Sequence, residues 1–150
     1  MREITSILDG KTAAILAEIC TQTKTAAAWQ AQDFLNETAQ KTSKIFVLNE
    51  TENNKKTALG FCAVRFVCES AEITNFAICP TQQRKHLGTE LFAHTLYFLK
   101  ANGVKNITLE VAASNISAQA FYKKFNFTCI NTRKKFYNMC EDALIFKVDL

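Results

Sequence analysis

The spacing of hydrophobic residues predicts two helices in the first quarter of the chain. Residues 11–22 carry an apolar stripe of alanine and isoleucine, the pattern of a helix with one face on a core. Residues 26–39 give a second helical segment, anchored by Trp29, Phe34 and Leu35. Both helices precede the first segment with strand character.

Three segments with strand character follow. Residues 45–48, 57–68 and 72–78 are rich in β-branched and aromatic residues, a composition typical of strands. The polar residues 49–56 predict a hairpin connection between the first two strands. Pro80 ends the third strand, because proline has no N–H to donate to a sheet.

Helical and strand patterns alternate in the second half of the chain. The amphipathic segment 82–101 predicts a long helix that stops at Asn102-Gly103. Apolar and polar residues then alternate over residues 107–111. This alternation predicts a strand with one buried face.

The last part of the chain adds a short helix and two strands. The helix is predicted at residues 116–125, with Ser114 or Asn115 as its N-cap. Residues 127–130 and 143–148 give the strands. The complete order of elements predicts an α/β (α+β) fold with a central mixed sheet.

The composition is that of a folded protein. The chain has 150 residues, of which 48% are hydrophobic, and we expect residues 1–150 to form a single domain with one core. Four glycines and one proline exclude collagen-like and proline-rich classes. The longest apolar runs fall far short of the roughly 20 residues that a membrane-spanning helix needs. We therefore expect a cytoplasmic protein that does not enter a membrane.

Charge and cysteine content do not single out a partner. The net charge of +4 suits an anionic small molecule or a weak contact with nucleic acid. The six cysteines form no Cys-x-x-Cys pair, and only two histidines accompany them. We therefore expect reduced thiols and no metal site.

The segment from Pro80 to Gly88 is the most informative for chemistry. It opens the long predicted helix, and backbone N–H groups at a helix N-terminus form a ready site for phosphate. Arg84 and Lys85 add positive charge there, and Gly88 omits a side chain where a ligand would approach the backbone. Taken alone, these residues fit a phosphate site and a solvated basic turn equally well.

The pattern Gln83-x-x-His86-x-Gly88 resembles the phosphate-binding loop of the GNAT superfamily of N-acetyltransferases, Gln/Arg-x-x-Gly-x-Gly/Ala. The resemblance extends over residues 72–148 and includes Leu109-Glu110-Val111, Ser114-Asn115, Ala120-Phe121-Tyr122 and Phe125-Asn126-Phe127. Residues 133–137 and 141–143 are similar to the branch that acetylates ribosomal proteins at an N-terminal alanine. The resemblance implies a mixed, mostly antiparallel sheet flanked by helices.

The resemblance also implies a binding site for acetyl-CoA. In the family, the strand before the loop pairs through its backbone with the pantetheine arm, here at Phe76, Ala77 and Ile78. The loop that holds the diphosphate corresponds to Gln83, Arg84, Lys85, His86, Leu87, Gly88 and Thr89. Asn115 corresponds to an asparagine that holds the pantetheine arm, although a role as N-cap explains it equally well.

His86 departs from the family, which usually has glycine at this position. A left-handed backbone there would cost about 1–2 kcal/mol for a residue other than glycine. We expect the loop to keep helical dihedral angles, with the His86 side chain directed away from the phosphates.

Glu110 and Tyr122 are the candidate catalytic residues. Because residues 107, 109 and 111 face one side of the predicted strand, Glu110 faces the other, where a carboxylate can take a proton from an attacking amine. The resemblance assigns the general base to Glu110 and assigns the general acid, which protonates the departing thiolate of CoA, to Tyr122. From the residues alone, Glu110 also fits a surface carboxylate and Tyr122 a core aromatic.

The acceptor side is implied by the resemblance alone. Glu110 and Tyr137 would contact the amine substrate, and Tyr137 is also expected beside the basic residues 133–135. A solvated basic turn explains the same segment without any ligand.

The predicted function is transfer of an acetyl group from acetyl-CoA to an amine, by direct attack in a ternary complex. The resemblance favours the N-terminal α-amine of a protein, namely a ribosomal protein with N-terminal alanine. The alternatives are a lysine or small-molecule amine as acceptor, and a non-catalytic CoA-binding module. Nucleic-acid binding is not expected, since the chain lacks the interleaved aromatic and basic residues of RNA-binding motifs.

Overall fold

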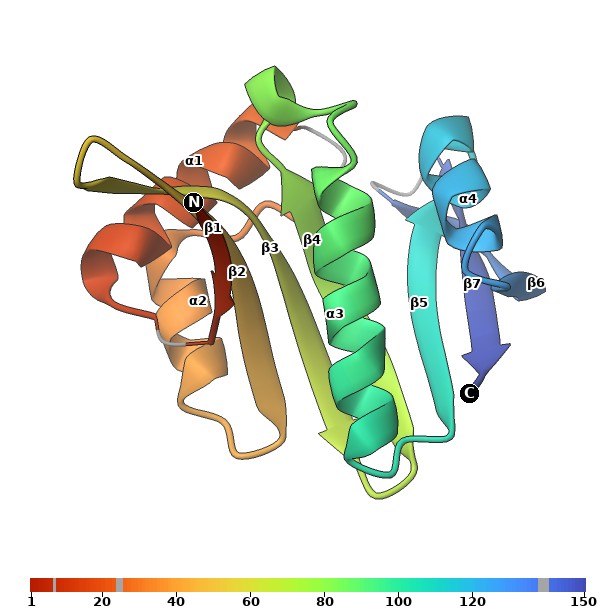
Figure 1. The fold of residues 1–150 in the computed structure, drawn as a ribbon. Coiled ribbons are helices and arrows are strands. Elements are labelled where there is room, and N and C mark those ends of the chain that lie inside the picture. Colours follow the sequence, from red (N-terminus) through yellow and green to blue (C-terminus); the bar gives the residue numbers. More distant parts are fainter. Residues whose placement is uncertain (7, 24–25, 138–140) are drawn as a thin grey trace.

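The alternation of apolar residues produces a seven-stranded sheet with helices on both faces (Figure 1). The computed structural model describes residues 1–6, 8–23, 26–137 and 141–150, with the backbone alone for residues 135–137. The strands are β1 (Arg2–Thr5), β2 (Ser43–Glu52), β3 (Lys55–Val67), β4 (Ser70–Ile78), β5 (Asn106–Ala112), β6 (Thr128–Tyr137) and β7 (Glu141–Asp149). The helices are α1 (Gly10–Thr23), α2 (Ala31–Thr38), the short 3-10 helix η1 (Pro80–Gln82), α3 (Leu87–Ala101) and α4 (Ile116–Lys123).

The sheet is mixed and mostly antiparallel. Its strand order is β1-β2-β3-β4-β5-β7-β6, and β4 and β5 are its one parallel pair of neighbours. The fold class expected from the sequence is therefore confirmed. Within the described ranges, no helix has the length and hydrophobicity needed to cross a membrane.

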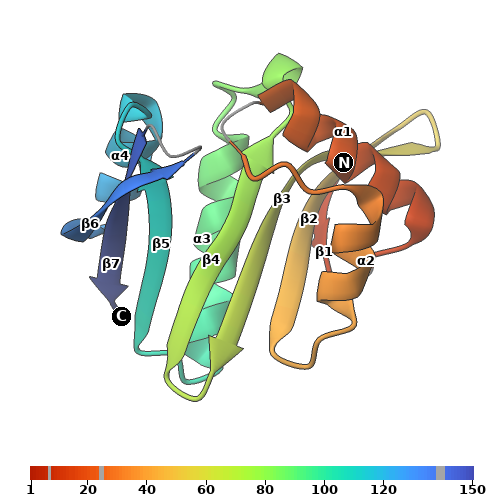
Figure 2. The same cartoon turned by 180° about the vertical axis from the view of Figure 1, so that it is seen from behind.

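Each face of the sheet packs against its own pair of helices. We call the side covered by α3 and α4 the α3 face, and the side covered by α1 and α2 the α1 face (Figures 1 and 2). Strand alternation divides the core between them, so that Phe46 and Leu48 of β2 pack on the α3 face and Ile45 and Val47 on the α1 face. Figure 2 shows α1 and α2 over the β1–β4 side of the sheet, with β5, β7 and β6 beside them.

The start of the chain differs from the sequence prediction in two places. Strand β1 was not predicted, because it is an edge strand of four residues whose side chains are exposed or half-buried. The second helix begins at Ala31 rather than residue 26. Asn75 of β4 explains the late start: its side chain accepts a hydrogen bond from Ala27 N at 3.2 Å and donates one to Ala27 O at 3.1 Å.

The connection between β2 and β3 is much shorter than predicted. The strands extend to Glu52 and from Lys55, so the turn consists of Asn53 and Asn54 instead of residues 49–56. Both asparagines have positive φ angles, 49° and 61°. Two left-handed residues match the twist of a tight hairpin, and asparagine tolerates this conformation better than most residues.

A buried carboxylate ties α2 to the sheet. The side chain of Glu37 is 8% exposed and accepts hydrogen bonds from Arg65 Nε at 2.6 Å and Nη2 at 2.8 Å. Ser43 Oγ donates a third, at 2.7 Å. The Arg65 hydrogen bonds lower the pKa of Glu37 from its ordinary value of 4.5, because they favour the ionised carboxylate.

We expect Glu37→Gln to lower the free energy of unfolding at neutral pH by about 1–2 kcal/mol, since Arg65 remains partly solvated and loses a charged partner. The wild-type contribution is complete above the ordinary glutamate pKa and disappears as the pH falls through the lower folded pKa. Urea unfolding of both proteins across that range should therefore converge in acid. Glu3→Gln, which breaks an exposed pair with Lys56, is the control and should cost under about 0.5 kcal/mol; equal losses would contradict this account.

Candidate active site between β4 and β5

Strands β4 and β5 pair along only part of their length. Their register runs from Ser70 opposite Asn106 to Ile73 opposite Leu109. Beyond this point the strands diverge, as both views of the ribbon show (Figures 1 and 2). We call the diverging parts, residues 74–78 of β4 and 110–112 of β5, the open end.

A β-bulge accounts for the divergence. Ala63 of β3 lies opposite Asn75 and Val64 opposite Ile73, so Thr74 is an extra residue on β4. Bulges bend the strand that carries them and increase its twist. Here the bend follows the last residue of β4 that pairs with β5, and it turns the rest of β4 away from β5.

The open end leaves backbone groups of β4 directed toward β5. Cys79 N donates to Leu59 O at 2.7 Å, and because hydrogen bonding alternates along an antiparallel pair, Ala77 also bonds to β3. Phe76 and Ile78 then direct their N–H and C=O groups to the opposite edge. Of the three residues expected to bind pantetheine through the backbone, two therefore have the required orientation.

The loop after β4 differs from the predicted helix start. The sequence placed a helix over residues 82–101 with helical dihedral angles at His86, whereas α3 begins at Leu87 and His86 has a φ of 60°. Arg84 is also left-handed, with a φ of 62°. Gln83 Nε2 donates to Ile78 O at 3.1 Å, and this contact holds the loop against the end of β4.

This loop presents positive groups to solvent. The hydrogen bond from Glu90 N to His86 O, 3.1 Å long, joins α3 to its N-cap, and the N–H groups of Leu87, Gly88 and Thr89 come before it. Such N–H groups have no partner inside a helix and attract anions. Arg84 and Lys85 are exposed beside them. The phosphate interpretation of the sequence therefore has a matching geometry.

Gly88 has a different environment from the one predicted. A Cβ at this position would lie 3.5 Å from Phe76 Cζ, 3.6 Å from Ile78 Cγ1 and 3.7 Å from Phe121 Cε2, so it would face the protein rather than a phosphate. The rings of Phe76 and Phe121 stack at 5.6 Å. They connect β4 to α4 across the α3 face of the open end.

Glu110 is the first residue of β5 beyond its pairing with β4. Ile107, Leu109 and Val111 are buried on the α3 face, so Glu110 points to the α1 face, as predicted. Its side chain is 25% exposed, and Arg133 Nη1 donates to its Oε1 at 2.6 Å. A partly shielded carboxylate thus lies at the base of the open end.

Tyr122 lies on the other side of the sheet. It is 9% exposed and belongs to the core of the α3 face. Its ring centroid is 5.5 Å from that of Phe92, 5.4 Å from that of Phe121 and 6.0 Å from that of Phe127. Glu110 and Tyr122 therefore belong to opposite faces, and β5 with its open end lies between those faces.

The remaining predicted residues have mixed outcomes. Asn115 is the N-cap of α4, where its Oδ1 accepts a hydrogen bond from Ala118 N at 3.1 Å. Tyr137 is the last residue of β6, but its side chain lies outside the described part of the structure. Its predicted contact with the acceptor therefore stays a prediction.

Two residues near the open end had no structural role in the site assigned to them from the sequence. Asn75 is buried and holds Ala27, so it fixes the segment before α2 against β4. A polar residue inside an apolar strand was the available signal. Arg133 reaches Glu110 from β6, two strands away. This contact depends on the order of the strands in the sheet, which the spacing of residues along the sequence does not indicate.

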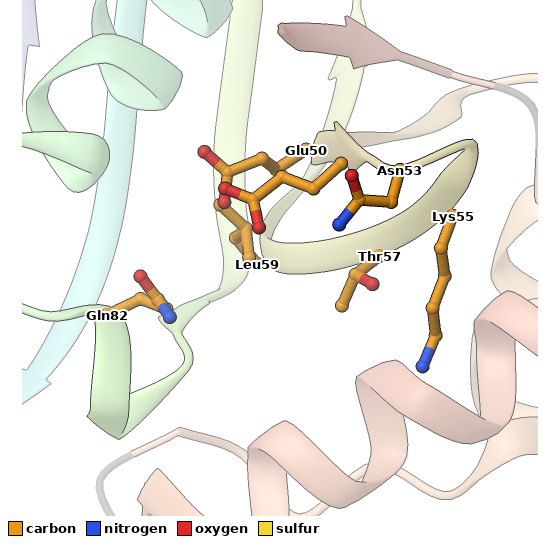
Figure 3. A pocket seen from close by; sticks show the side chains of 7 residues that line it. Glu50, Asn53, Lys55, Thr57, Leu59 and Gln82 are labelled. Carbon is orange, nitrogen blue, oxygen red and sulfur yellow. The ribbon is translucent and has the colours of Figure 1, made fainter.

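A separate pocket of about 440 Å³ lies between the β2–β3 hairpin and η1 (Figure 3). Its lining residues are Glu50, Glu52, Asn53, Lys55, Thr57, Leu59 and Gln82. In Figure 3, the Gln82 side chain lies across the pocket from Leu59 and Glu50. None of the lining residues is a predicted site residue, so this pocket is distinct from the open end.

The described residues contain no group of three or more His, Cys, Asp or Glu side chains placed to hold a metal ion. The cysteines that the structure describes are free thiols, namely Cys20, Cys62, Cys68, Cys79 and Cys129. Burial raises the pKa of the Cys62 thiol to about 12, so this thiol is protonated at neutral pH and is not a nucleophile.

A family model agrees with this geometry. The model of the acetyltransferase (GNAT) family matches residues 13–127, which include the open end, the loop and both candidate catalytic residues. The chain belongs to the GNAT family. It is an N-acetyltransferase that depends on acetyl-CoA.

Relatives of this GNAT protein point to one branch of the family. It is 32% identical to the [ribosomal protein bS18]-alanine N-acetyltransferase of Salmonella typhimurium over 142 residues, 88% of this chain and 95% of that protein. The Escherichia coli protein of the same name is 34% identical over 103 residues, 67% of this chain and 68% of that one. A crystal structure of the ribosomal-protein-S18-alanine N-acetyltransferase from Escherichia coli superposes with a TM-score of 0.83 at 29% identity, covering 99% of this chain and 94% of that chain.

The left-handed backbone of His86 generates a stability prediction. We expect His86→Gly to raise the free energy of unfolding by about 0.5–1 kcal/mol, because the relief of about 1–2 kcal/mol of strain exceeds the extra entropy of a glycine in the unfolded chain. His86→Ala keeps the strain and should change stability by less than about 0.5 kcal/mol. Urea unfolding measures both variants, and an equal gain for alanine would contradict the assignment to backbone strain.

Proposed function

We propose that this GNAT protein transfers the acetyl group of acetyl-CoA to the N-terminal α-amine of a protein, with a ribosomal protein bS18 that begins with alanine as the acceptor. The observation that supports acetyl transfer is the open end of the sheet with the Glu110 carboxylate next to it. The acceptor rests on the relatives, which bear that substrate in their names and match at 32% and 34% identity. A ribosomal acceptor would place the enzyme, as one domain over residues 1–150, in the cytoplasm.

The donor would lie along the loop and the open end. The N–H groups of Leu87, Gly88 and Thr89, together with Arg84 and Lys85, would bind the diphosphate of acetyl-CoA. The pantetheine arm would then follow the free edge of β4 as an added strand. Phe76 and Ile78 supply outward backbone groups there, and the Ile78 carbonyl already accepts from Gln83.

The two proposed proton transfers would take place on opposite faces of the sheet. An α-amine has a pKa near 8, so part of it is protonated at neutral pH and must lose a proton to attack. Glu110 on the α1 face would accept that proton, directly or through one water, while the amine nitrogen attacks the thioester carbon. The carbon–sulfur bond then breaks, and Tyr122 on the α3 face would protonate the departing thiolate. This last transfer is undemanding because a thiol has a pKa near 8.5.

The location of Glu110 fits a polypeptide acceptor. Glu110 points to the α1 face, where α1 and α2 lie over the β1–β4 side of the sheet and β5, β7 and β6 lie beside them (Figure 2). An extended chain end could therefore approach β5 without displacing a helix. A lysine or small amine remains the alternative acceptor, since the same carboxylate could serve either.

Acceptor choice is tested with a peptide panel. The purified protein is incubated with acetyl-CoA and a peptide that copies the N-terminus of bS18, and mass spectrometry with fragmentation locates the acetyl group. We expect acetylation at the α-amine of alanine and none on the same peptide with a blocked N-terminus and an internal lysine. Acetylation of the lysine alone would overturn the proposed acceptor, and no acetylation of any amine would favour a CoA-binding module.

The catalytic roles are tested by Glu110→Gln and Tyr122→Phe. We expect kcat to fall by about 100-fold or more for Glu110→Gln and about 10-fold for Tyr122→Phe, the range typical of lost acid–base catalysis. Calorimetry should show acetyl-CoA affinity within about twofold of wild type, since neither group binds the diphosphate. Glu72→Gln, an exposed carboxylate on β4, is the matched control and should keep full activity. Unchanged kcat in both test variants would reject the roles.

A further inference from the structure

The ion pair between Glu110 and Arg133 joins the open end to the far edge of the sheet. Arg133 Nη1 lies 2.6 Å from Glu110 Oε1, and the two side chains are 49% and 25% exposed. A hydrogen bond between two charged groups at this distance is short and directional. It fixes one oxygen of the proposed base while the reacting part of the site is still accessible to substrate.

Strand register explains how Arg133 reaches so far. Glu110 of β5 lies opposite Ile145 of β7, and Ala143 of β7 lies between Ala112 of β5 and Arg133 of β6. The arginine must therefore pass over β7, across about 10 Å from β6 to β5. Ala143 and Ala112, the residues beside Arg133 on the next two strands, have small side chains that leave space for the guanidinium to approach Glu110.

Among the described side chains, Arg133 forms an ion pair with Glu110, and two other charged groups lie near Glu110 on this face. Glu72 of β4 and Lys147 of β7 both lie opposite Thr108 of β5. Thr108 is two residues before Glu110 and faces the same side, so both charged residues are also on the α1 face. Arg65 of β3 is engaged by Glu37 of α2.

The acidic residues at the start of β7 contact the segment that follows β5. Glu141 Oε1 accepts a hydrogen bond from Ser114 N at 2.8 Å, which lowers the pKa of Glu141. Asp142 is adjacent in sequence, and its backbone oxygen accepts from Ala113 N at 3.0 Å. These contacts tie the start of β7 to Ala113 and Ser114, just beyond the end of β5.

We propose that Arg133 is a positioning residue for acetyl transfer: by holding one carboxylate oxygen of Glu110, it orients the carboxylate toward the open end. This inference rests on the proposed role of Glu110 as general base. A charged hydrogen bond that is short and directional fixes the side chain that accepts it. Loss of Arg133 should let the Glu110 carboxylate rotate away from the position in which it accepts the amine proton, and so lower kcat.

The test compares Arg133→Gln, Arg133→Lys and the matched control Lys134→Gln. Lys134 is the next residue of β6 and is exposed, so its variant makes the same charge change and leaves the pair between Arg133 and Glu110 in place. For each protein, kcat and KM are measured for acetyl-CoA and for the bS18 N-terminal peptide. Arg133→Gln is also combined with Glu110→Gln, to test whether the two changes act on the same step.

We expect Arg133→Gln to lower kcat by about 10-fold, the effect of a misplaced catalytic group, and to have little further effect when Glu110→Gln is already present. Arg133→Lys should restore most of kcat, and Lys134→Gln should leave kcat unchanged. KM for acetyl-CoA should stay within about twofold, since Arg133 is not among the groups proposed to bind acetyl-CoA.

The outcomes separate this inference from the proposed function. An unchanged kcat in Arg133→Gln, in a protein that Glu110→Gln still inactivates, would overturn the positioning role alone. Full activity in Glu110→Gln would reject Glu110 as the base, and the present inference would fall with it. An equal loss of kcat in Lys134→Gln would assign the effect to net charge and would also overturn the proposal.

Discussion

The incomplete pairing of β4 with β5 is the constraint on which the rest of the site depends. Parallel pairing ends at Ile73 and Leu109 because the bulge at Thr74 bends β4 away. An edge of unpaired backbone inside a sheet is normally a liability, since N–H and C=O groups need partners. Here it lies between two helical layers, beside a helix N-terminus and next to a carboxylate. The arrangement provides what a thioester donor with an amide-containing arm requires.

The loop after β4 contains backbone strain next to the candidate site. Arg84 and His86 both adopt left-handed backbone conformations, with φ near 60°, which side-chain-bearing residues avoid. The Gln83 side chain holds the loop to Ile78, and α3 then starts at Leu87 instead of at the preceding polar residues. The N–H groups of the first turn consequently lie next to the free edge of β4. Such local strain is common where a ligand is bound.

The sequence predicted those elements whose pattern is local and failed where the outcome depends on other parts of the chain. Alternation over residues 107–111 placed Glu110 on the correct face, and the loop motif located the start of α3 within a few residues. The late start of α2 depends on Asn75, a residue of a distant strand. The contact of Arg133 with Glu110 depends on β7 lying between β5 and β6. Neither relation has a sequence spacing that could reveal it.

The most direct measurement of the central claim is a crystal structure with acetyl-CoA bound. We predict the diphosphate at the N–H groups of residues 87–89, the pantetheine arm hydrogen-bonded to the backbone of Phe76 and Ile78, and the thioester within reach of Glu110. Acetyl-CoA bound elsewhere, for example at the pocket beside Glu50, would contradict this prediction. So would a complex in which β4 and β5 pair along their full length and leave no room for the donor.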